Sequence, residues 1–377
     1  MTDDSLPEPD RVEGAPHPRD TAHLFGQQAA EASFLEAFSM GRLHHGWLVT
    51  GPRGVGKATL AWRIARFLLA TPLQGAGGLF GDPPPPPDTL DIAETHPVAR
   101  RLRAGAEPGL FLLRRGPNDK GDRLSTDIRV DEVRRLKSFL HLSAADGGRR
   151  VVIVDAADEL NIAAANALLK LLEEPPAGAT LLLISHQPSG LLPTIRSRCR
   201  ELRLSPLSPD DLALALTQAD ARIPDHAALA VLSAGSAGEA IRLANLDGLA
   251  LYARIVALFG SLPRLDRPRA LALAETATQR GAGAEGRLDL LLTLFDLFLS
   301  RLARAGILGQ TGPEAAPDEA ALLARLSPHD RAARDWASLH QTLGARARHG
   351  RAVNLDPGAL VLDMILRIDQ AAGQLAR

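Results

Sequence analysis

Three short segments of uninterrupted hydrophobic residues stand out in the first half of the chain, with helical repeats of hydrophobic positions between them. The segments cover residues 46–50, 151–154 and 179–185. Such runs are typical of strands in a parallel sheet that helices cover on both faces. The helical repeats lie at about 57–70, at 126–142, where Thr126 and Asp127 could cap the helix, and at 159–174, before Pro175. The pattern predicts an α/β fold.

Beyond about residue 205 the hydrophobic pattern is helical throughout. Residues 206–248 are expected to form a small helical lid, and residues 249–377 a helical C-terminal domain. In that domain "LDLLLTLFDLFLSRLARAGI" (288–307) is either a core helix or a partner-binding helix, because the two look alike in sequence.

Two polar segments fall outside this pattern. Residues 1–20 are rich in proline and charge and are expected to be a disordered leader before the α/β domain, residues 21–205. Within that domain, residues 71–125 are expected to be an excursion from the sheet. Five consecutive prolines lie in its first part and indicate a polyproline-like surface segment.

Composition narrows the class of protein. The 377 residues carry a formal net charge of −1, so the chain as a whole lacks the basic excess of a dedicated nucleic-acid binder. Cys199 is the only cysteine, which excludes an internal disulfide and a zinc site built from several thiolates. The sequence shows no signal peptide and no apolar stretch of membrane-spanning length. We therefore expect a cytoplasmic protein that binds no zinc and no membrane.

A phosphate-binding motif follows the first hydrophobic segment and opens a helix. Residues 51–58, "GPRGVGKA", match the pattern G-x-x-x-x-G-K-[ST] at every position except the last. Gly51, Gly54 and Gly56 let backbone N–H groups turn around phosphate oxygens, and Lys57 would reach the terminal phosphates. In this strand–turn–helix context the motif predicts a fold that can cradle a nucleotide.

The residues that would turn ATP over are altered. Ala58 stands where the motif has the hydroxyl that ligates magnesium, and Thr59 points about 100° away from that position on the helix. Asp155, at the end of the second hydrophobic segment, fits the acid that orients the metal, but Ala156 follows where hydrolysing P-loop proteins commonly carry glutamate. Asp158 is expected in the first turn of the next helix, where an acid favours the helix dipole. The metal site is expected to be compromised.

Two further motifs give the chain a specific resemblance. The segments "NALLKLLEEPP" (166–176) and "TIRSRC" (194–199) resemble those of clamp-loader subunits in the AAA+ superfamily, above all the delta-prime type of bacterial DNA polymerase III. The resemblance extends from about Leu24 to Asn245. It implies an AAA+ P-loop sheet, a helical lid, and a helical collar domain through which a hetero-pentamer assembles.

The resemblance also implies roles for single residues. Arg198 matches the arginine finger, which reaches the ATP bound by a neighbouring subunit, and a planar, always charged guanidinium suits that task. Ser185 falls where the family has the polar sensor of the terminal phosphate. The second sensor of active relatives, an arginine, falls on Gly238, with Arg242 one helical turn later. Many relatives carry a four-cysteine zinc module within the region of 71–125, which has no cysteine here.

Three interpretations of the nucleotide site remain open. In the favoured one, the chain is a non-hydrolysing subunit that supplies Arg198 in trans, while ATP binding at its own site is weak or absent. In the second, it is an active ATPase subunit of the same loader, with Thr59 or water completing the metal site and Asp158 acting as base. In the third, the loop holds ATP structurally. The resemblance implies motor and delta-type subunits as partners, and through the complex the sliding clamp and primed DNA.

Overall fold

The computed structural model describes residues 8–71, 87–142, 148–221, 225–278 and 284–375. The chain divides into two compact units, which comprise residues 1–221 with 235–238, and residues 222–234 with 239–377. The predicted lid is not a unit of its own in this division, because its first helix lies in the first unit and its later residues lie mainly in the second. The three-part organisation therefore stays a prediction.

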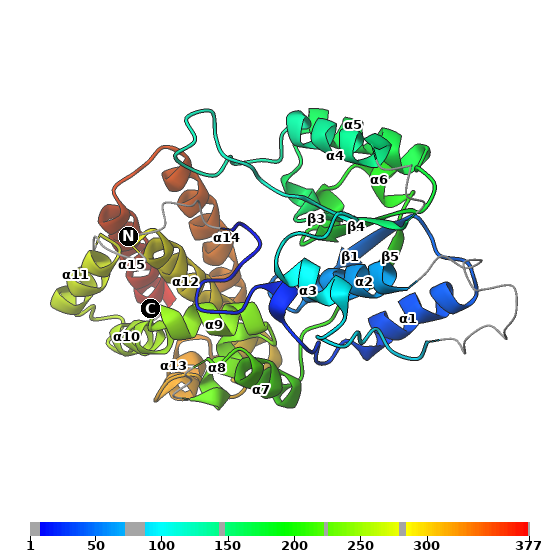
Figure 1. Cartoon of the computed structure of the whole chain (residues 1–377). Helices are drawn as coiled ribbons and strands as arrows, with labels where there is room; N and C mark the ends of the chain where they lie inside the picture. The colour runs from blue at the N-terminus through cyan, green and yellow to red at the C-terminus, as the bar shows by residue number, and fades with distance from the viewer. Residues whose placement is uncertain (1–7, 72–86, 143–147, 222–224, 279–283, 376–377) are drawn as a thin grey trace, which may run out of the picture. The chain divides into compact units, whose positions relative to one another are not determined.

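The first unit is built on a five-stranded parallel sheet (Figure 1). Its order is β2–β3–β4–β1–β5, and every neighbouring pair runs parallel. The strands are β1 (Gly46–Thr50), β2 (Leu110–Leu113), β3 (Arg150–Val154), β4 (Ala179–Ser185) and β5 (Arg200–Arg203). The predicted α/β fold is confirmed, and the three predicted strands are the three central ones.

The two edge strands were not predicted. β5 had the pattern of a loop because only Leu202 of its four residues is buried. Charged side chains are common on edge strands, where they discourage pairing with another chain. β2 lies within residues 71–125, so the prediction that this region leaves the sheet is wrong for residues 110–113. Most of the proline run lies outside the described residues.

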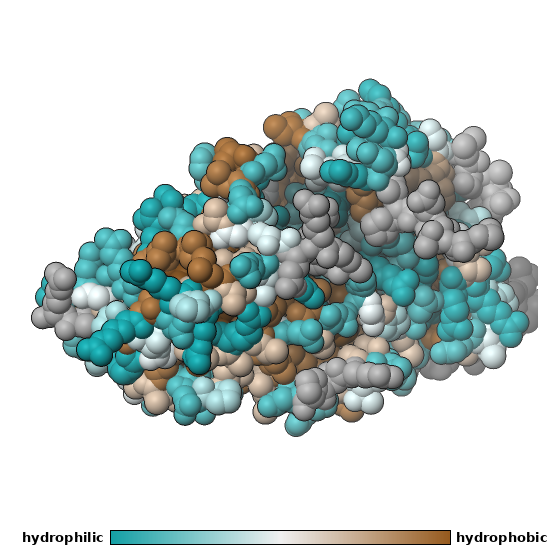
Figure 2. All heavy atoms as spheres, turned by 90° about the vertical axis from the view of Figure 1, so that its left-hand side faces the viewer, coloured by the Kyte–Doolittle hydropathy of each residue, from teal (hydrophilic) through white to brown (hydrophobic). Residues whose placement is uncertain are grey.

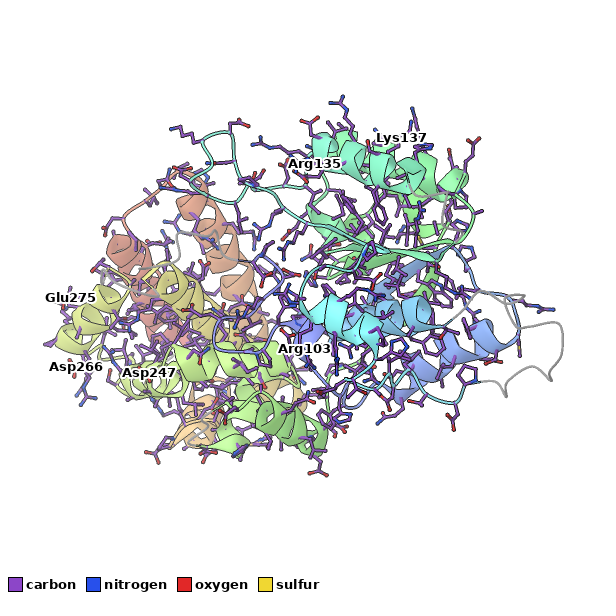
Figure 3. The ribbon with its side chains drawn as sticks, viewed as in Figure 1. Arg103, Arg135, Lys137, Asp247, Asp266 and Glu275 are labelled. Atoms are coloured by element: carbon purple, nitrogen blue, oxygen red, sulfur yellow. The ribbon has the colours of Figure 1, made fainter. Side chains whose placement is uncertain are left out.

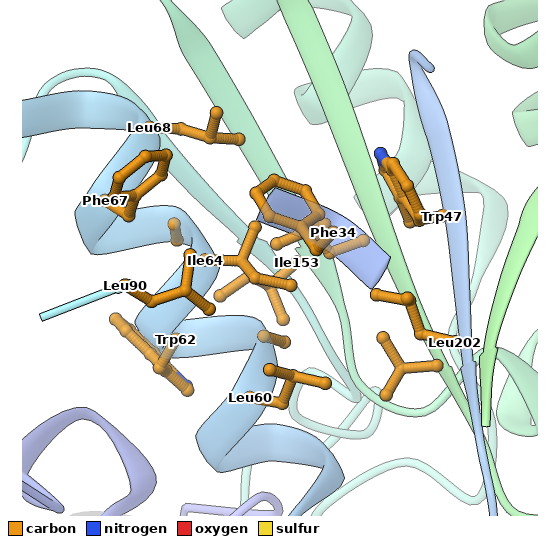
Figure 4. Close-up of a cluster of buried hydrophobic side chains, with 14 of the residues drawn as sticks. Phe34, Trp47, Leu60, Trp62, Ile64, Phe67, Leu68, Leu90, Ile153 and Leu202 are labelled. Carbon is orange, nitrogen blue, oxygen red and sulfur yellow. The ribbon is translucent and has the colours of Figure 1, made fainter. Parts of the chain in front are cut away.

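Helices cover both faces of the sheet. They are α1 (Gln28–Ser39), α2 (Lys57–Ala70), α3 (Pro97–Arg103), α4 (Val130–Leu142), α5 (Ile162–Glu173) and α6 (Pro193–Arg196), whereas α7 (Pro209–Gln218) belongs to the first unit but not to these two layers. Successive residues of β3 join opposite cores: Ile153 packs with α1 and α2, and Val152 packs with α4 and α5. Figure 4 shows the first core, in which Phe34 and Ile64 lie among the side chains between helix and sheet.

Helix α4 begins four residues later than predicted. Ile128 lies before the helix and pairs instead with the segment after β3, where its N–H donates to the carbonyl of Glu159 over 2.6 Å. The backbone is therefore extended at the position that Thr126 and Asp127 were expected to cap. On its outer side α4 exposes Arg134, Arg135 and Lys137, and Figure 3 shows the last two pointing away from the sheet.

Residues 8–20, here called the N-terminal strap, pack against the first unit and correct the prediction of a disordered leader. The Asp10 carboxylate lies 3.1 Å from the His17 ring and also contacts Arg114, and the side chains of Asp10 and His17 are 0% and 2% exposed. The His17 ring meets Trp62 edge-on. Composition counts charges but not their partners, and here the charges are paired. Residues 1–7 lie outside the described residues.

The regular elements among the described residues of the second unit are helices. The helices are α8 (His226–Ser233), α9 (Ala237–Asn245), whose first two residues belong to the first unit, α10 (Gly248–Gly260), α11 (Arg267–Thr276), α12 (Ala284–Leu308), α13 (Glu319–Leu326), α14 (Asp330–Ala352) and α15 (Pro357–Leu375). The segment 288–307 lies in α12 and is a core helix packed chiefly against α14, with Phe295, Phe298 and Leu302 all 0% exposed.

Some large hydrophobic side chains of the second unit remain exposed. They are Leu271, Ile307, Leu308, Val353, Leu355 and Leu366. Figure 2 shows hydrophobic residues gathered in several patches among hydrophilic ones on one face. In the part of the chain that the structure describes, no single helix is long and apolar enough to cross a membrane. The pair α8 and α9, bent by 119°, passes that test by length and composition only.

Candidate nucleotide site and arginine finger

The predicted nucleotide-site residues lie together at the carboxyl ends of the strands, here called the carboxyl edge of the sheet. The loop of residues 51–56 follows β1, Lys57 opens α2, Asp155 follows β3, and Ser185 ends β4. Since β3, β4 and β1 are parallel neighbours, their carboxyl ends lie side by side. Ligands of open parallel sheets bind at this carboxyl edge.

The backbone of the phosphate loop is covered by another segment of the first unit. The N–H of Gly238 donates to the carbonyl of Gly54 over 3.0 Å, and the Ser236 hydroxyl donates to the carbonyl of Arg53 over 2.8 Å. Gly54 has φ +76°, and a Cβ atom there would lie 2.2 Å from the Ser236 oxygen. The position expected for the second sensor is thus a glycine in close contact with the loop.

Lys57 is bound by its own loop. Its side chain is 3% exposed, and Nζ donates to the carbonyls of Gly51, over 2.7 Å, and Pro52. Burial lowers the pKa of Lys57 to about 8, although the charges of Asp155 and Asp158 oppose that shift. A phosphate at this loop would have to take the ammonium group from these two carbonyls.

Asp155 lies beside further acids. Burial raises its pKa to about 7, and the negative charges of Asp10 and Glu159 act in the same direction. A carboxyl group that is partly protonated near neutral pH is a weak ligand for magnesium, because metal ligands must be deprotonated. Asp10 comes from the strap, so the strap contributes a charge at the carboxyl edge that the sequence did not reveal.

Asp158 fastens the end of β4. The Ser185 hydroxyl, which is completely buried, donates to Asp158 Oδ1 over 2.6 Å, and the N–H of His186 also donates to this carboxylate. Burial and the charges of Lys57 and Arg53 lower the pKa of His186 to about 4, so its imidazole is neutral at pH 7. Asp158 lies in a short 3-10 helix (Ala157–Glu159) before α5, so it does sit in a helical turn, but its carboxylate binds the end of β4.

The metal position of the loop is also apolar. Ala58 packs against the first core, and Thr59 is half-buried one residue further along α2. Among the described residues, no group of three or more His, Cys, Asp or Glu side chains could hold a metal ion. The loop keeps three glycines with positive φ, Gly51, Gly54 and Gly56, but the side chains around it fit a magnesium–triphosphate poorly.

Arg198 lies in a different environment. It follows α6 and precedes β5, and its side chain is 36% exposed. One guanidinium nitrogen, Nη2, lies 2.8 Å from Glu173 Oε1, and Nη1 donates to the carbonyl of Thr194 over 3.1 Å. The charged group is therefore at the surface and oriented by two neighbours.

Arg198 lies near the amino ends of the strands, here called the amino edge of the sheet, whereas the phosphate loop lies at their carboxyl ends. β5 runs parallel to β1 with Arg200 opposite Trp47, and a Cβ atom on Gly46 would lie 3.1 Å from the carbonyl of Arg198. Gly46 begins β1, whereas the loop follows Thr50. Four residues of extended strand span about 13 Å, so Arg198 is remote from the loop of its own chain.

The residues beside Arg198 in the sequence show no comparable arrangement at the surface. The Arg200 guanidinium lies over the Trp47 ring, 5.2 Å from its centroid, and Arg196 is exposed at the end of α6. Burial raises the pKa of the Cys199 thiol to about 12, which makes the thiol unreactive near neutral pH. Arg242, in the second unit, forms an ion pair with Glu239 over 2.7 Å.

The contacts of Asp10 and of Glu173 were not predicted from the sequence, for different reasons. Asp10 gave no signal, because a polar, proline-rich segment does not reveal its partners. Glu173 did give one, since acids in the last turn of a helix oppose the helix dipole and call for another explanation. "LLEEPP" places two acids there, and only the structure pairs one of them with Arg198.

The fold and the loop define a P-loop protein of the AAA+ class. The sheet is parallel, with the glycine-rich loop after β1, and a helical unit accompanies it. The family model described as "DNA polymerase III, delta subunit" matches residues 26–208. Subunit delta′ of Escherichia coli (strain K12) is 31% identical over 343 residues, which are 89% of this chain and 92% of that protein. The chain therefore belongs to the DNA polymerase III subunit delta′ family.

Other similarities cover different shares of the chain. Subunit delta′ of Pseudomonas aeruginosa is 43% identical over 155 residues, which are 41% of each protein. A solved structure of a DNA polymerase III gamma subunit-related protein from Thermotoga maritima covers 90% of this chain and 99% of that one, with a TM-score of 0.40 and 18% identity. That structural likeness is too low to bear on function.

Proposed function

We propose that this chain is a non-hydrolysing clamp-loader subunit that supplies Arg198 in trans to ATP held by a neighbouring subunit. The observation that carries the proposal is the separation of the two candidate sites. Arg198 lies at the amino edge of the sheet and the phosphate loop follows the carboxyl end of β1. A guanidinium so placed is available to a second subunit and not to its own loop.

The condition of the chain's own site supports the same proposal. Lys57 donates to its own loop, Ser185 donates to Asp158, and Gly238 lies against Gly54. An active ATPase would need Asp158 as a base, but that carboxylate already accepts hydrogen bonds from the end of β4. These contacts disfavour hydrolysis in cis, while the retained loop backbone is compatible with weak ATP binding.

The relatives' names supply the setting. They are subunits of DNA polymerase III, so we propose that this chain acts in DNA replication, in a complex with motor and delta-type subunits. Such a complex would load a sliding clamp on primed DNA, with ATP hydrolysed by the motor subunits. The helical second unit would provide the collar through which the subunits assemble.

The test uses the full chain, alone and reconstituted with the motor and delta-type subunits of its organism. Lys57→Ala should leave ATP-dependent clamp loading within about twofold of the natural protein, because removing a residue from a site that does no chemistry changes little. Lys120→Ala, which removes an exposed lysine, is the matched control. The isolated chain should show no ATP turnover.

Measurable turnover by the isolated chain, lost in Lys57→Ala, would refute the proposal in favour of an active ATPase. Titration of the isolated chain with a fluorescent ATP analogue, with and without magnesium, separates an empty loop from one that holds nucleotide. We expect weak binding or none, and no gain from magnesium.

A further inference from the structure

The guanidinium of Arg198 already has an anionic partner in its own subunit. Glu173 Oε1 lies 2.8 Å from Nη2, and the carbonyl of Thr194 accepts from Nη1. Glu173 is the last residue of α5, and Thr194 lies in α6. Two helices thus orient one arginine at the amino edge of the sheet.

The Glu173 backbone is fixed although its side chain is exposed. The preceding residue, Leu172, is buried, and its carbonyl is hydrogen-bonded to the His45 ring over 2.9 Å. The next residue closes the helix, because the N–H of Glu174 donates to the carbonyl of Lys170, and Pro175 follows. The end of α5 therefore presents the Glu173 carboxylate at a defined place.

Helix stability does not explain an acid at this position. The carboxyl end of a helix carries a partial negative charge, so Glu173 is unfavourable for α5 by itself. Its described polar contact is with Arg198. Both side chains are well exposed, at 36% and 48%, and exposed ion pairs are weak. A phosphate binds the planar guanidinium through two charge-assisted hydrogen bonds and can replace a single carboxylate contact.

We propose that Glu173 is a positioning residue that holds Arg198 at the amino edge until the terminal phosphate of a nucleotide on the adjacent subunit takes the guanidinium from it. This inference rests on the proposed role of Arg198. Glu173 competes with the phosphate for one guanidinium, so it raises the ATP concentration at which the neighbouring site engages. The turnover rate at saturating ATP does not depend on Glu173, because the carboxylate has then been displaced.

The test is Glu173→Gln in the reconstituted loader, with ATPase activity measured against ATP concentration in the presence of clamp and primed DNA. The substitution keeps the shape and removes the charge. The ATP concentration for half-maximal activity should fall by about 1.5- to 5-fold, the range for losing one exposed ion pair, while kcat is unchanged. The shift should shrink as salt is added.

Two further variants isolate the contact. Glu174→Gln makes the same charge change one residue later, and we expect it to behave as the natural protein. In an Arg198→Ala background, Glu173→Gln should have no further effect, because the two residues act as a pair. A purely structural role for Glu173 would lower kcat or assembly and would persist in that background.

The outcomes distinguish this inference from the proposed function. If Arg198→Ala impairs loading while Glu173→Gln leaves the half-saturating ATP concentration unchanged or raises it, Arg198 acts in trans and the positioning role is wrong. If Arg198→Ala loads clamps normally, both proposals are wrong.

Discussion

The charged groups at the carboxyl edge and the amino edge of the parallel sheet differ in burial and in their partners. At the carboxyl edge Lys57 is buried and bound to its own loop, and Asp158 accepts from Ser185. At the amino edge Arg198 is 36% exposed and held by an exposed acid. The first edge has the outline of a nucleotide site with its polar groups turned inward, and the second presents a charge outward.

Under the proposed function, the phosphate-binding motif remains in this chain while the chemistry takes place in a neighbouring subunit. The groups that would meet phosphate have partners within the chain, because Lys57 donates to the carbonyls of its own loop and Ser185 donates to Asp158. The Arg198 guanidinium, in contrast, lies at the surface, where a second subunit can reach it. Replacing residues at each edge should therefore have different kinds of consequence: loss of complex activity at one, and changes in stability at the other.

The largest effect is expected from Arg198→Ala. Arginine fingers supplied in trans contribute roughly 10³- to 10⁵-fold to hydrolysis in other nucleotide-hydrolysing proteins, so ATP turnover by the reconstituted loader should fall by orders of magnitude. Assembly and thermal unfolding should not change, because the side chain is exposed. Clamp-loading assays measure the loss of activity and gel filtration measures assembly, with exposed Arg196→Ala as the control. Equal losses in both variants would remove the special status of Arg198.

A smaller effect on stability is expected from Gly51→Ala at the other edge. Gly51 has φ +139°, and a Cβ atom there would lie 2.5 Å from the carbonyl oxygen of Leu204. The backbone strain alone costs about 1–3 kcal/mol, and the close contact adds to it. Thermal denaturation followed by circular dichroism should show that unfolding of the variant begins at a lower temperature than unfolding of the natural protein.

The control for that substitution is Gly105→Ala. Gly105 also has positive φ, at +66°, but no atom lies within 4 Å of its Cβ position, so only the backbone cost remains. The loader reconstituted with Gly51→Ala below its unfolding temperature should retain clamp loading. Loss of loading by a folded variant would mean that the carboxyl edge does chemistry after all, and the contrast between the edges would fail.

The smallest expected effect is a pH dependence at Asp155. Because the pKa of Asp155 is raised to about 7 in the folded chain, its contribution to stability is full at acidic pH, below its unfolded pKa, and is lost as the pH rises through 7. Asp155→Asn removes the titration, so this variant should gain roughly 1–3 kcal/mol relative to the natural protein between pH 5 and pH 8. Urea denaturation at several pH values measures this, with exposed Asp88→Asn as control. A constant difference across that range would show that Asp155 is not perturbed.

The sequence predicted what depends on continuous hydrophobic burial. β1, β3 and β4 are buried on both faces, so their residues form uninterrupted apolar runs, and α2 was placed correctly at 57–70. β5 escaped prediction because an edge strand needs only one buried side chain, Leu202. The strap escaped because its order depends on pairs such as Asp10 with Arg114, which are far apart in the sequence.

By itself, the sequence determined the class of fold, the family and the altered positions in the phosphate loop, because hydrophobic runs and motifs are local patterns. Only the tertiary structure decided which groups meet. It bound Lys57 to its loop, joined Asp158 to Ser185, set Gly238 against Gly54, and separated Arg198 from the loop by the length of a strand. Hydrogen bonds and charges act over a few ångströms, and only the folded chain brings residues from distant segments that close.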